Sequence, residues 1–159
     1  MTDVLHGRFV VVPAAYVFLL RPGPWPGARE VLLQLRRGTG YMDEHWAAAA
    51  AGHVEKHETV EQAARREALE ELGVTDLALQ PWTAMQRTNP GHAAIDERVD
   101  YFFTATSWTG TPVVQEPGKA ADLRWFSLDA LPDPVVPHEA AVLATVRAGS
   151  APPFLSFGF

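Results

Sequence analysis

The stretch between residues 52 and 74, GHVEKHETVEQAARREALEELGV, constrains the structure of this chain more than any other. Thr59 followed three residues later by Gln62 forms a capping-box pattern, which is typical of a helix start. Gly73 suits the left-handed conformation with which many helices end. These signals predict a loop that opens on Gly52 and a helix over Val60–Leu72. Small or apolar side chains supply its packing surface, at Ala63, Ala64, Ala68 and Leu72.

Three glutamates share one face of this predicted helix. Glu67, Glu70 and Glu71 stand at positions i, i+3 and i+4, a spacing that places their carboxylates side by side. Like charges at this spacing destabilise a helix by about 0.2–0.5 kcal/mol per pair. A bound cation would remove that repulsion, and hard carboxylate oxygens suit Mg²⁺ or Mn²⁺. A solvated, glutamate-rich face is the commoner origin of such a pattern, so the glutamates alone do not decide.

The spacing of the whole segment resembles the Nudix box, the signature of the Nudix hydrolase family. The matching positions are Gly52, Glu58, Arg66, Glu67, Glu70, Glu71 and Gly73, followed by the aliphatic Val74. A solvated helix face does not explain this full set of intervals. Further along, the segment Glu116–Phe126 (EPGKAADLRWF) resembles the E-P-x-K…W stretch of the MutT-like nucleotide pyrophosphohydrolase group.

The resemblance implies a role for each matching residue. In the family, the glutamates that match Glu67, Glu70 and Glu71 bind the divalent ions that bridge a diphosphate. The residues that match Arg66 and Glu58 brace the loop and the helix against each other. These five residues are therefore the catalytic candidates.

Two residues near the box glycine are further metal-site candidates by the same resemblance. The carbonyl group that matches Ala51 often completes the coordination, and the position of Glu55 sometimes contributes a ligand through water. Many family members carry a proline and a glycine immediately before the box glycine, where this chain has Ala50 and Ala51. His53 and His57 lie close by, but Mg²⁺ prefers oxygen, so we expect them to support the loop.

The implied chemistry is attack of water on a diphosphate. The linkage is strongly anionic and repels a nucleophile, so metal ions are needed to neutralise it, orient it and activate water. Glu67 or another nearby carboxylate can act as the general base, with its pKa tuned by the cluster. Mg²⁺ or Mn²⁺ is the expected cofactor.

Composition excludes several other classes of protein. A net charge of −6 leaves no basic surface for nucleic acid, and the chain has no cysteine for disulfides or thiol chemistry. No run approaches the roughly 18 apolar residues of a membrane span, and the amino terminus does not resemble a signal peptide. We expect a single cytoplasmic domain over residues 1–159 with a small-molecule substrate.

Apolar and β-branched runs predict strands on both sides of the box. We expect strands over Phe9–Leu20, Glu30–Arg36, Leu77–Thr88, Asp96–Trp108 and Leu123–Leu128, and a second helix over His138–Ala148. Pro13 indicates an edge position or a bulge, Pro81 indicates a break or bulge, and Tyr41–Ala51 is expected to be extended. The order of elements matches the α/β Nudix fold, an α/β/α sandwich with a mixed central sheet.

The C-terminal region gives two further expectations. The apolar face of the second helix is assigned to Ala140, Ala141, Leu143, Ala144 and Val146. The apolar tail over residues 151–159 is expected to pack against the domain or to contact a neighbouring subunit in a homodimer.

Several residues bear on the choice of substrate. Glu97 opens a strand where family members often place a further metal ligand or base, and a solvated strand end explains it equally well. The MutT-like resemblance implies that Glu116, Lys119 and Trp125 line the nucleotide pocket, and a Pro-Gly surface turn with an exposed lysine explains the segment equally well. Arg98 is a further substrate-binding candidate. Pro90, sixteen residues after Val74, gives a weaker resemblance to the group that cleaves ADP-ribose.

A nucleoside triphosphate, cleaved to a monophosphate and pyrophosphate, is the leading expectation. ADP-ribose or another nucleotide sugar is the first alternative, followed by dinucleoside polyphosphates and coenzyme A derivatives. A non-catalytic nucleotide-binding module is the second alternative, although such proteins usually lose box glutamates. Isopentenyl diphosphate isomerase shares the fold, but it requires a cysteine that this chain lacks.

Overall fold

The computed structural model describes residues 5–159, which form strands and helices in a mixed α/β order. The strands are β1 (Val12–Pro22), β2 (Arg29–Arg36), β3 (Trp46–Ala48), β4 (Ala50–His53), β5 (Leu79–Arg87), β6 (Arg98–Ala105), β7 (Ala120–Ser127) and β8 (Phe154–Phe157). The helices are α1 (Val60–Leu72), the 3₁₀ turn η1 (Ala94–Asp96) and α2 (Pro137–Ala148). Within the described part of the chain, no helix is both long and apolar enough to cross a membrane.

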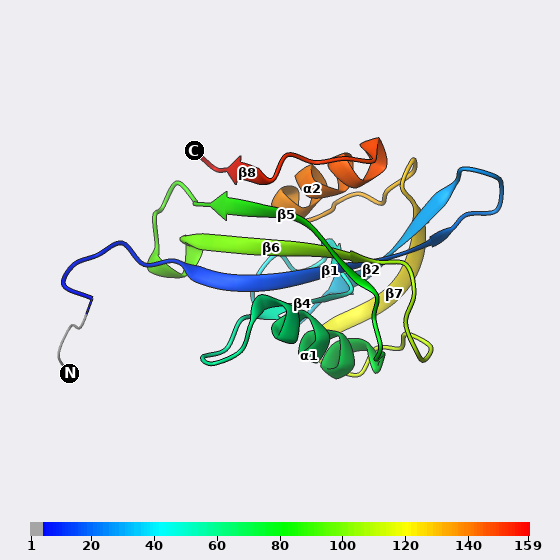
Figure 1. Cartoon of the computed structure of the whole chain (residues 1–159), viewed down its shortest axis with the longest axis horizontal. Helices are drawn as coiled ribbons and strands as arrows, with labels where there is room; N and C mark the ends of the chain where they lie inside the picture. The colour runs from blue at the N-terminus through cyan, green and yellow to red at the C-terminus, as the bar shows by residue number, and fades with distance from the viewer. Residues whose placement is uncertain (1–4) are drawn as a thin grey trace.

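The strands form one mixed sheet in the order β3-β2-β1-β6-β5-β8, with β4 also paired to β1 and β7 also paired to β2. The pairs β1–β6 and β5–β8 are parallel, and the other neighbours are antiparallel. Helix α1 lies on one side of this sheet and α2 on the other (Figure 1). The expected α/β/α arrangement with a mixed sheet is therefore confirmed.

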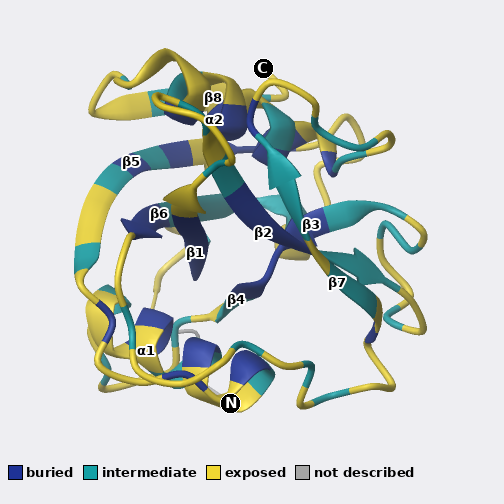
Figure 2. Cartoon of the chain, turned by 90° about the vertical axis from the view of Figure 1, so that its right-hand side faces the viewer, coloured by how far each residue is buried: buried dark blue, intermediate teal, exposed yellow. Residues whose placement is uncertain are grey.

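Strand β1 is the centre of the core because both of its faces are covered. On one face, Ala15, Val17 and Leu19 pack with the buried side of α1. On the other face, Tyr16 and Phe18 belong to the cluster that includes the apolar residues of α2. Figure 2 shows the burial concentrated along β1, β2 and the inward side of α1.

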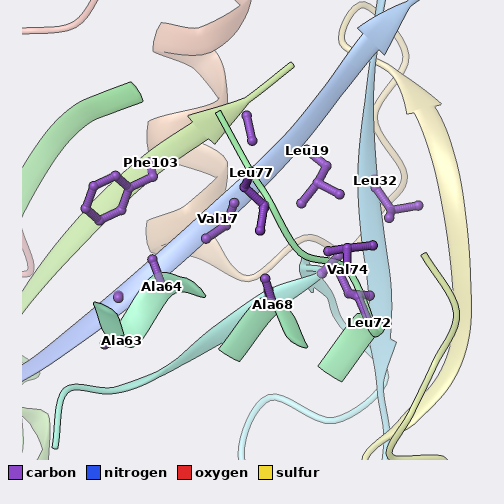
Figure 3. Close-up of a cluster of buried hydrophobic side chains, with 14 residues drawn as sticks. Val17, Leu19, Leu32, Ala63, Ala64, Ala68, Leu72, Val74, Leu77 and Phe103 are labelled. Atoms are coloured by element: carbon purple, nitrogen blue, oxygen red, sulfur yellow. The ribbon is translucent and has the colours of Figure 1, made fainter. Parts of the chain in front are cut away.

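Helix α1 has the bounds and the ends that the sequence predicts. Thr59 accepts a hydrogen bond from the backbone N–H of Gln62, whose side chain bonds back to the backbone of Thr59. Gly73 ends the helix in the left-handed conformation, with φ of 72°. The predicted packing surface is confirmed as the buried face, formed by Ala63, Ala64, Ala68 and Leu72. Figure 3 shows these side chains directed at Val17, Leu19 and Phe103 of the sheet.

Several strand predictions are also confirmed. The register between β5 and β6 shifts between Pro81 and Thr83, which is the expected irregularity. The tail packs against the domain, because β8 pairs with β5. Of the two alternatives expected for Pro13, the structure shows no bulge, and the ladder pairs β1 with β6 alone at this residue, so Pro13 lies at a local edge. The proline is tolerated because it lies near the start of β1, just before the β4 ladder begins at Ala14.

The predicted apolar face of α2 is partly wrong. Ala141 and Ala144 are exposed, whereas Val142 is buried together with Leu143 and Val146. The first turn also buries two polar residues, His138 and Glu139. The helix is rotated relative to the alanine-based expectation because these polar side chains face a cleft rather than solvent.

Candidate active site

A cleft of about 870 Å³ opens beside α1. Its lining comes from the strands β1 to β7, from α1, from the loop after β2 and the segments that precede β6 and β7, and from the first turn of α2. This volume lies within the usual range for small-molecule sites. Of the residues singled out from the sequence, the cleft is lined by Ala51, Gly52, His53, Glu55, Arg66, Glu67, Glu70, Glu71, Asp96, Arg98, Glu116 and Lys119.

The box glycine makes room for one of the carboxylates. A Cβ atom placed on Gly52 would overlap the carboxylate of Glu67, because that group lies directly against β4. A larger residue at position 52 must therefore displace the carboxylate. Glu67 occupies its place in the cleft only because Gly52 has no side chain.

Arg66 connects the helix to the loop that precedes it. Its Nη2 donates to Glu58 Oε1 at 2.7 Å and to the carbonyl oxygen of His53 at 3.0 Å, and its Nε donates to Glu58 Oε2 at 3.1 Å. Its Nη1 donates to Glu67 Oε1 at 2.7 Å and to Glu70 Oε2 at 3.3 Å. The bond from Arg66 is the main reason that the pKa of Glu58 lies below its usual range. Arg66 thus fixes the loop and orients two of the three box carboxylates.

Glu71 is oriented from the opposite side by β2. The Nε2 of Gln34 donates to Glu71 Oε2 at 3.3 Å and to the carbonyl oxygen of Ala48 at 3.1 Å. The N–H of the same alanine donates to Glu139 Oε1 at 2.7 Å. A chain of hydrogen bonds therefore runs from the buried carboxylate of α2 to a box glutamate of α1.

The donor set at the α1 end of the cleft suits a hard divalent cation. Burial, followed by the neighbouring Glu67, raises the pKa of Glu71, so an added positive charge would relieve the crowding of carboxylates. Carboxylate oxygens are the ligands that Mg²⁺ and Mn²⁺ prefer. Within residues 5–159, no three acidic or histidine side chains already converge on a single point, and the Arg66 guanidinium instead engages Glu67 and Glu70.

Two pairs of charged residues lie at other points of the cleft. Lys119 Nζ is 2.9 Å from Glu116 Oε2 in the turn before β7, and both residues line the cleft. Glu55 also lines it, with Oε1 3.7 Å from Arg66 Nη1, and its side chain is mostly exposed. The structure thus brings the MutT-like turn and the box helix to one cavity.

Away from α1, the cleft is lined by charged residues of β5 and β6. Arg87 and Arg98 are direct partners in the β5–β6 register. Arg87 Nε donates to Asp100 Oδ2 at 2.8 Å, and Arg98 Nε lies 3.7 Å from Asp100 Oδ1. Burial raises the pKa of Asp100 against the opposing effect of Arg87.

The first turn of α2 adds two titratable groups beside these arginines. His138 Nε2 lies 3.3 Å from the Tyr16 hydroxyl, and burial together with Arg87 lowers the pKa of this imidazole to about 2. The ring is therefore neutral at physiological pH. Burial also raises the pKa of Glu139 to about 7.

Three candidates from the sequence do not line the cleft. Glu97 accepts a hydrogen bond from Thr88 Oγ1 at 2.7 Å and stabilises the turn before β6. The indole of Trp125 instead stacks on Trp108, with the Arg21 guanidinium 4.2 Å from its ring centre. The third, Glu58, affects the site only indirectly, because it accepts a hydrogen bond from Arg66. The structure therefore gives no support to Glu97 as a metal ligand or to Trp125 as a substrate contact.

Sequence reasoning missed a larger group of cleft residues. They are Gln34, Arg36, Tyr41, Arg87, His138 and Glu139. Each lies in or beside an element whose sequence gives no functional motif, and they meet only through strand pairing. No local sequence signal marks Arg87, because β5 also carries other polar residues, and only the structure shows that this arginine is buried.

Fold and cleft together define a class: an α/β/α protein with an acidic helix beside a nucleotide-sized cavity. The family model described as NUDIX domain matches residues 11–146, so this chain belongs to the NUDIX family. It is accordingly a hydrolase of the class that acts on phosphorus-containing anhydrides, enzymes that generally use divalent metals. No curated protein sequence matches the chain.

Solved structures show the same fold. The MutT NUDIX hydrolase from Burkholderia pseudomallei is 26% identical, with a TM-score of 0.68, and the match covers 83% of this chain and 98% of that one. RenU, a Nudix hydrolase from M. smegmatis, is 30% identical, with a TM-score of 0.62 and coverage of 86% and 84%. The NUDIX domain of Shewanella oneidensis NrtR, complexed with ADP ribose, is 16% identical, with a TM-score of 0.70 and 93% coverage of both chains, which shows a shared fold alone.

Proposed function

We propose that this chain is a Mg²⁺- or Mn²⁺-dependent pyrophosphohydrolase that cleaves a diphosphate linkage in a nucleotide. The leading substrate class is a (deoxy)nucleoside triphosphate, cleaved to a monophosphate and pyrophosphate. One observation carries the proposal: Glu67, Glu70 and Glu71 open into the same cleft as Glu116 and Lys119 of the MutT-like turn. A diphosphate held at the glutamates would thus lie in a cavity large enough for the rest of a nucleotide.

The chain's own residues have distinct tasks in this proposal. Glu67, Glu70 and Glu71 would hold the divalent cation, which when bound neutralises the diphosphate and activates water. Arg66 keeps two of these carboxylates in place, and Gln34 fixes the third. Glu67 or a neighbouring carboxylate would take the proton from the attacking water.

The choice of a triphosphate over other nucleotides is supported by the turn before β7. Lys119 can neutralise a phosphate, and the pair Glu116–Lys119 lines the cleft as the MutT-like resemblance implies. The 26% identity to a MutT NUDIX hydrolase agrees with this choice. ADP-ribose or a nucleotide sugar is the alternative, supported by the Pro90 loop, which leads to the cleft residues Ile95 and Asp96.

The proposal is tested by measuring release of pyrophosphate, phosphate or AMP from dNTPs, NTPs, ADP-ribose and nucleotide sugars with Mg²⁺ and with Mn²⁺. The parent enzyme is compared with a Glu70→Gln, Glu71→Gln double variant. Glu61→Gln is the matched control, because Glu61 lies on the same helix but pairs with Arg65 at the surface.

Turnover by the parent and by the control, but not by the double variant, is the expected result and would identify the substrate class. Absence of turnover across the panel, with divalent metal bound, would reject the leading substrates. Absence of both turnover and metal binding would favour a non-catalytic nucleotide-binding module.

A further inference from the structure

Two arginines face each other where the cleft meets β5 and β6. Arg87 of β5 and Arg98 of β6 are direct cross-strand partners, an arrangement in which like charges destabilise a sheet. Their side chains are only 6% and 12% exposed, so little solvent screens the repulsion. Both residues line the cleft. A pairing that is unfavourable for the fold calls for a compensating ligand.

The carboxylate of Asp100, which lies between the two arginines, does not satisfy them both. Asp100 is fully buried and accepts one hydrogen bond from Arg87 at 2.8 Å. Arg98 Nε lies 3.7 Å from Asp100 Oδ1, too far for a hydrogen bond, and both of these buried atoms lack a hydrogen-bond partner. Two guanidinium groups therefore lie beside one carboxylate, of which one oxygen accepts no hydrogen bond.

The other elements around this end of the cleft contribute charges of both signs, including Asp96, which comes shortly before Arg98 and also lines the cleft. From β2, Arg36 contributes a third guanidinium, and from α2, Glu139 contributes a second carboxylate, already bonded to the N–H of Ala48. The hydroxyls of Tyr16 and Tyr41 are uncharged. Apart from burial, the groups that lower the pKa of the neighbouring His138 are Arg87, Arg98 and Arg36, so this imidazole experiences the positive field directly.

We propose that Arg87 and Arg98, with Arg36 at the side, form an anion subsite, called here the basic end of the cleft. It takes a compact oxyanion, a phosphate monoester or a carboxylate, carried by the substrate at a distance from the scissile diphosphate. Guanidinium groups bind such oxyanions through paired, charge-assisted hydrogen bonds. A buried cation without a full counter-charge is costly, and the oxyanion supplies the missing charge. That the anion belongs to a substrate rests on the proposed function.

Two parts of a nucleotide could supply this chemistry. The terminal phosphate of a triphosphate reaches the basic end if the polyphosphate chain runs along the cleft. A phosphate or carboxylate on the far group reaches it if the nucleotide lies in the opposite direction. The two sources are distinguished below by matched pairs of compounds that differ in one oxyanion.

The subsite is tested first without any catalysis, by titrating inorganic phosphate into the metal-free protein in EDTA at constant ionic strength. The main variant is Arg98→Gln, because Arg98 Nε makes no hydrogen bond and its Nη1 makes only a long one, 3.5 Å, to the carbonyl oxygen of Ile95. Arg147→Gln, which affects only an exposed pair with Asp129, is the matched control. Glu70→Gln reports on the α1 end of the cleft.

Saturable phosphate binding is expected in the parent protein, in Arg147→Gln and in Glu70→Gln. Arg98→Gln is expected to weaken it at least tenfold, and Arg98→Lys, which keeps the charge, to recover part of the loss. Thermal unfolding is recorded for each variant, and if Arg98→Gln does not fold, Arg98→Lys and Arg87→Lys are compared instead. Absence of saturable binding, or binding that none of these changes weakens, overturns the proposal.

The second test uses turnover of matched pairs: a dNTP with its dNDP, ADP-ribose with its 2′-phosphate, and UDP-glucose with UDP-glucuronate. The pair that matches the true source should show a preference of at least tenfold in KM for the more anionic member, and Arg98→Gln should remove it. Turnover without such a preference, together with no phosphate binding, rejects the subsite while the proposed function stands. Phosphate binding that Arg98→Gln weakens, with no turnover of any compound, rejects the proposed function and supports the subsite.

Discussion

The carboxylate of Glu67 fills the space that a side chain at position 52 would occupy, and this explains why the box has a glycine there. We predict that Gly52→Ala lowers kcat/KM at least about tenfold, or about 1.4 kcal/mol, because the new methyl group displaces the carboxylate. Stability should change little, since the group displaced is the end of a flexible side chain. Gly91→Ala is the control, because a Cβ there meets no atom within 4 Å. Equal activity of both variants would show that the position of Glu67 is unimportant.

Gln34 lies between two elements of the site and makes a second residue-scale prediction possible. Gln34→Leu removes both bonds of the amide, to Glu71 and to Ala48, and releases the box carboxylate from β2. We expect the dissociation constant for Mg²⁺, measured by calorimetry, to rise by about three- to tenfold, which corresponds to the net free energy of one ordinary hydrogen bond. Gln86→Leu, an exposed change on β5, should leave it unaltered.

Glu139 is predicted to make stability depend on pH. Its pKa is raised from 4.5 to about 7 by burial, so the folded protein holds this proton where the unfolded chain has lost it. This proton contributes roughly 3 kcal/mol to the free energy of unfolding. The contribution is complete below pH 4.5 and is lost as pH rises through 7. In urea unfolding at pH 5 and pH 8, Glu139→Gln should therefore gain on the parent at the higher pH. The same difference at both pH values would contradict the assignment.

At the residue scale, the sequence predicts contacts that are local and misses those that depend on register. The box residues are close in sequence or face one another across one loop, so their spacing alone indicates a site. Arg87 and Arg98 meet only because β5 and β6 pair in one register, and Glu139 joins them only because α2 turns a polar edge to the cleft. Trp125 shows the opposite outcome: its position in the MutT-like segment predicted a substrate contact, but its ring stacks on Trp108.

At the scale of elements, α1 is predictable because both of its ends carry their own signals. We expect Thr59→Ala to lower the free energy of unfolding by about 1 kcal/mol, because the N-cap hydroxyl bonds the exposed N–H of Gln62. Chemical denaturation measures this loss, and Thr111→Ala in an exposed turn is the control. A loss of similar size in the control would remove the cap as the cause.

The other elements show where such local signals stop. Existence of the strands follows from apolar and β-branched runs, and their bounds differ from the expectation by a few residues. The buried face of α2 was predicted incorrectly because alanine is common both in protein cores and on surfaces. The larger apolar side chain of Val142 marks the face that is in fact buried. The parallel pairing of β8 with β5 joins residues that lie far apart in the sequence, such as Ala84 and Phe154, and no local pattern encodes it.

For the whole molecule, binding of a divalent ion should be coupled to folding. The charge of −6 includes the crowded carboxylates beside α1, and a cation bound only by the folded state stabilises it. At 100 times the dissociation constant, Mg²⁺ should raise the free energy of unfolding by about 2.7 kcal/mol, and EDTA should reverse the gain. Thermal unfolding should show this for the parent and Glu61→Gln, but not for Glu70→Gln, Glu71→Gln. An equal gain in the double variant would place the ion elsewhere.

The face of α1 that packs on the sheet consists mainly of alanines. Ala63, Ala64 and Ala68 are fully buried in a cluster that includes Ala15, Ala49 and Ala50. Such small side chains let a helix approach a sheet closely, which sets how far its carboxylates stand from the glycine loop. Mg²⁺ binds oxygen at about 2.0–2.1 Å and Ca²⁺ at about 2.3–2.6 Å. Under the proposed function, the preference of the site for a smaller or a larger cation would then depend on alanines that do not contact the ion. Substitution of these alanines would change that preference even if every metal ligand stayed the same.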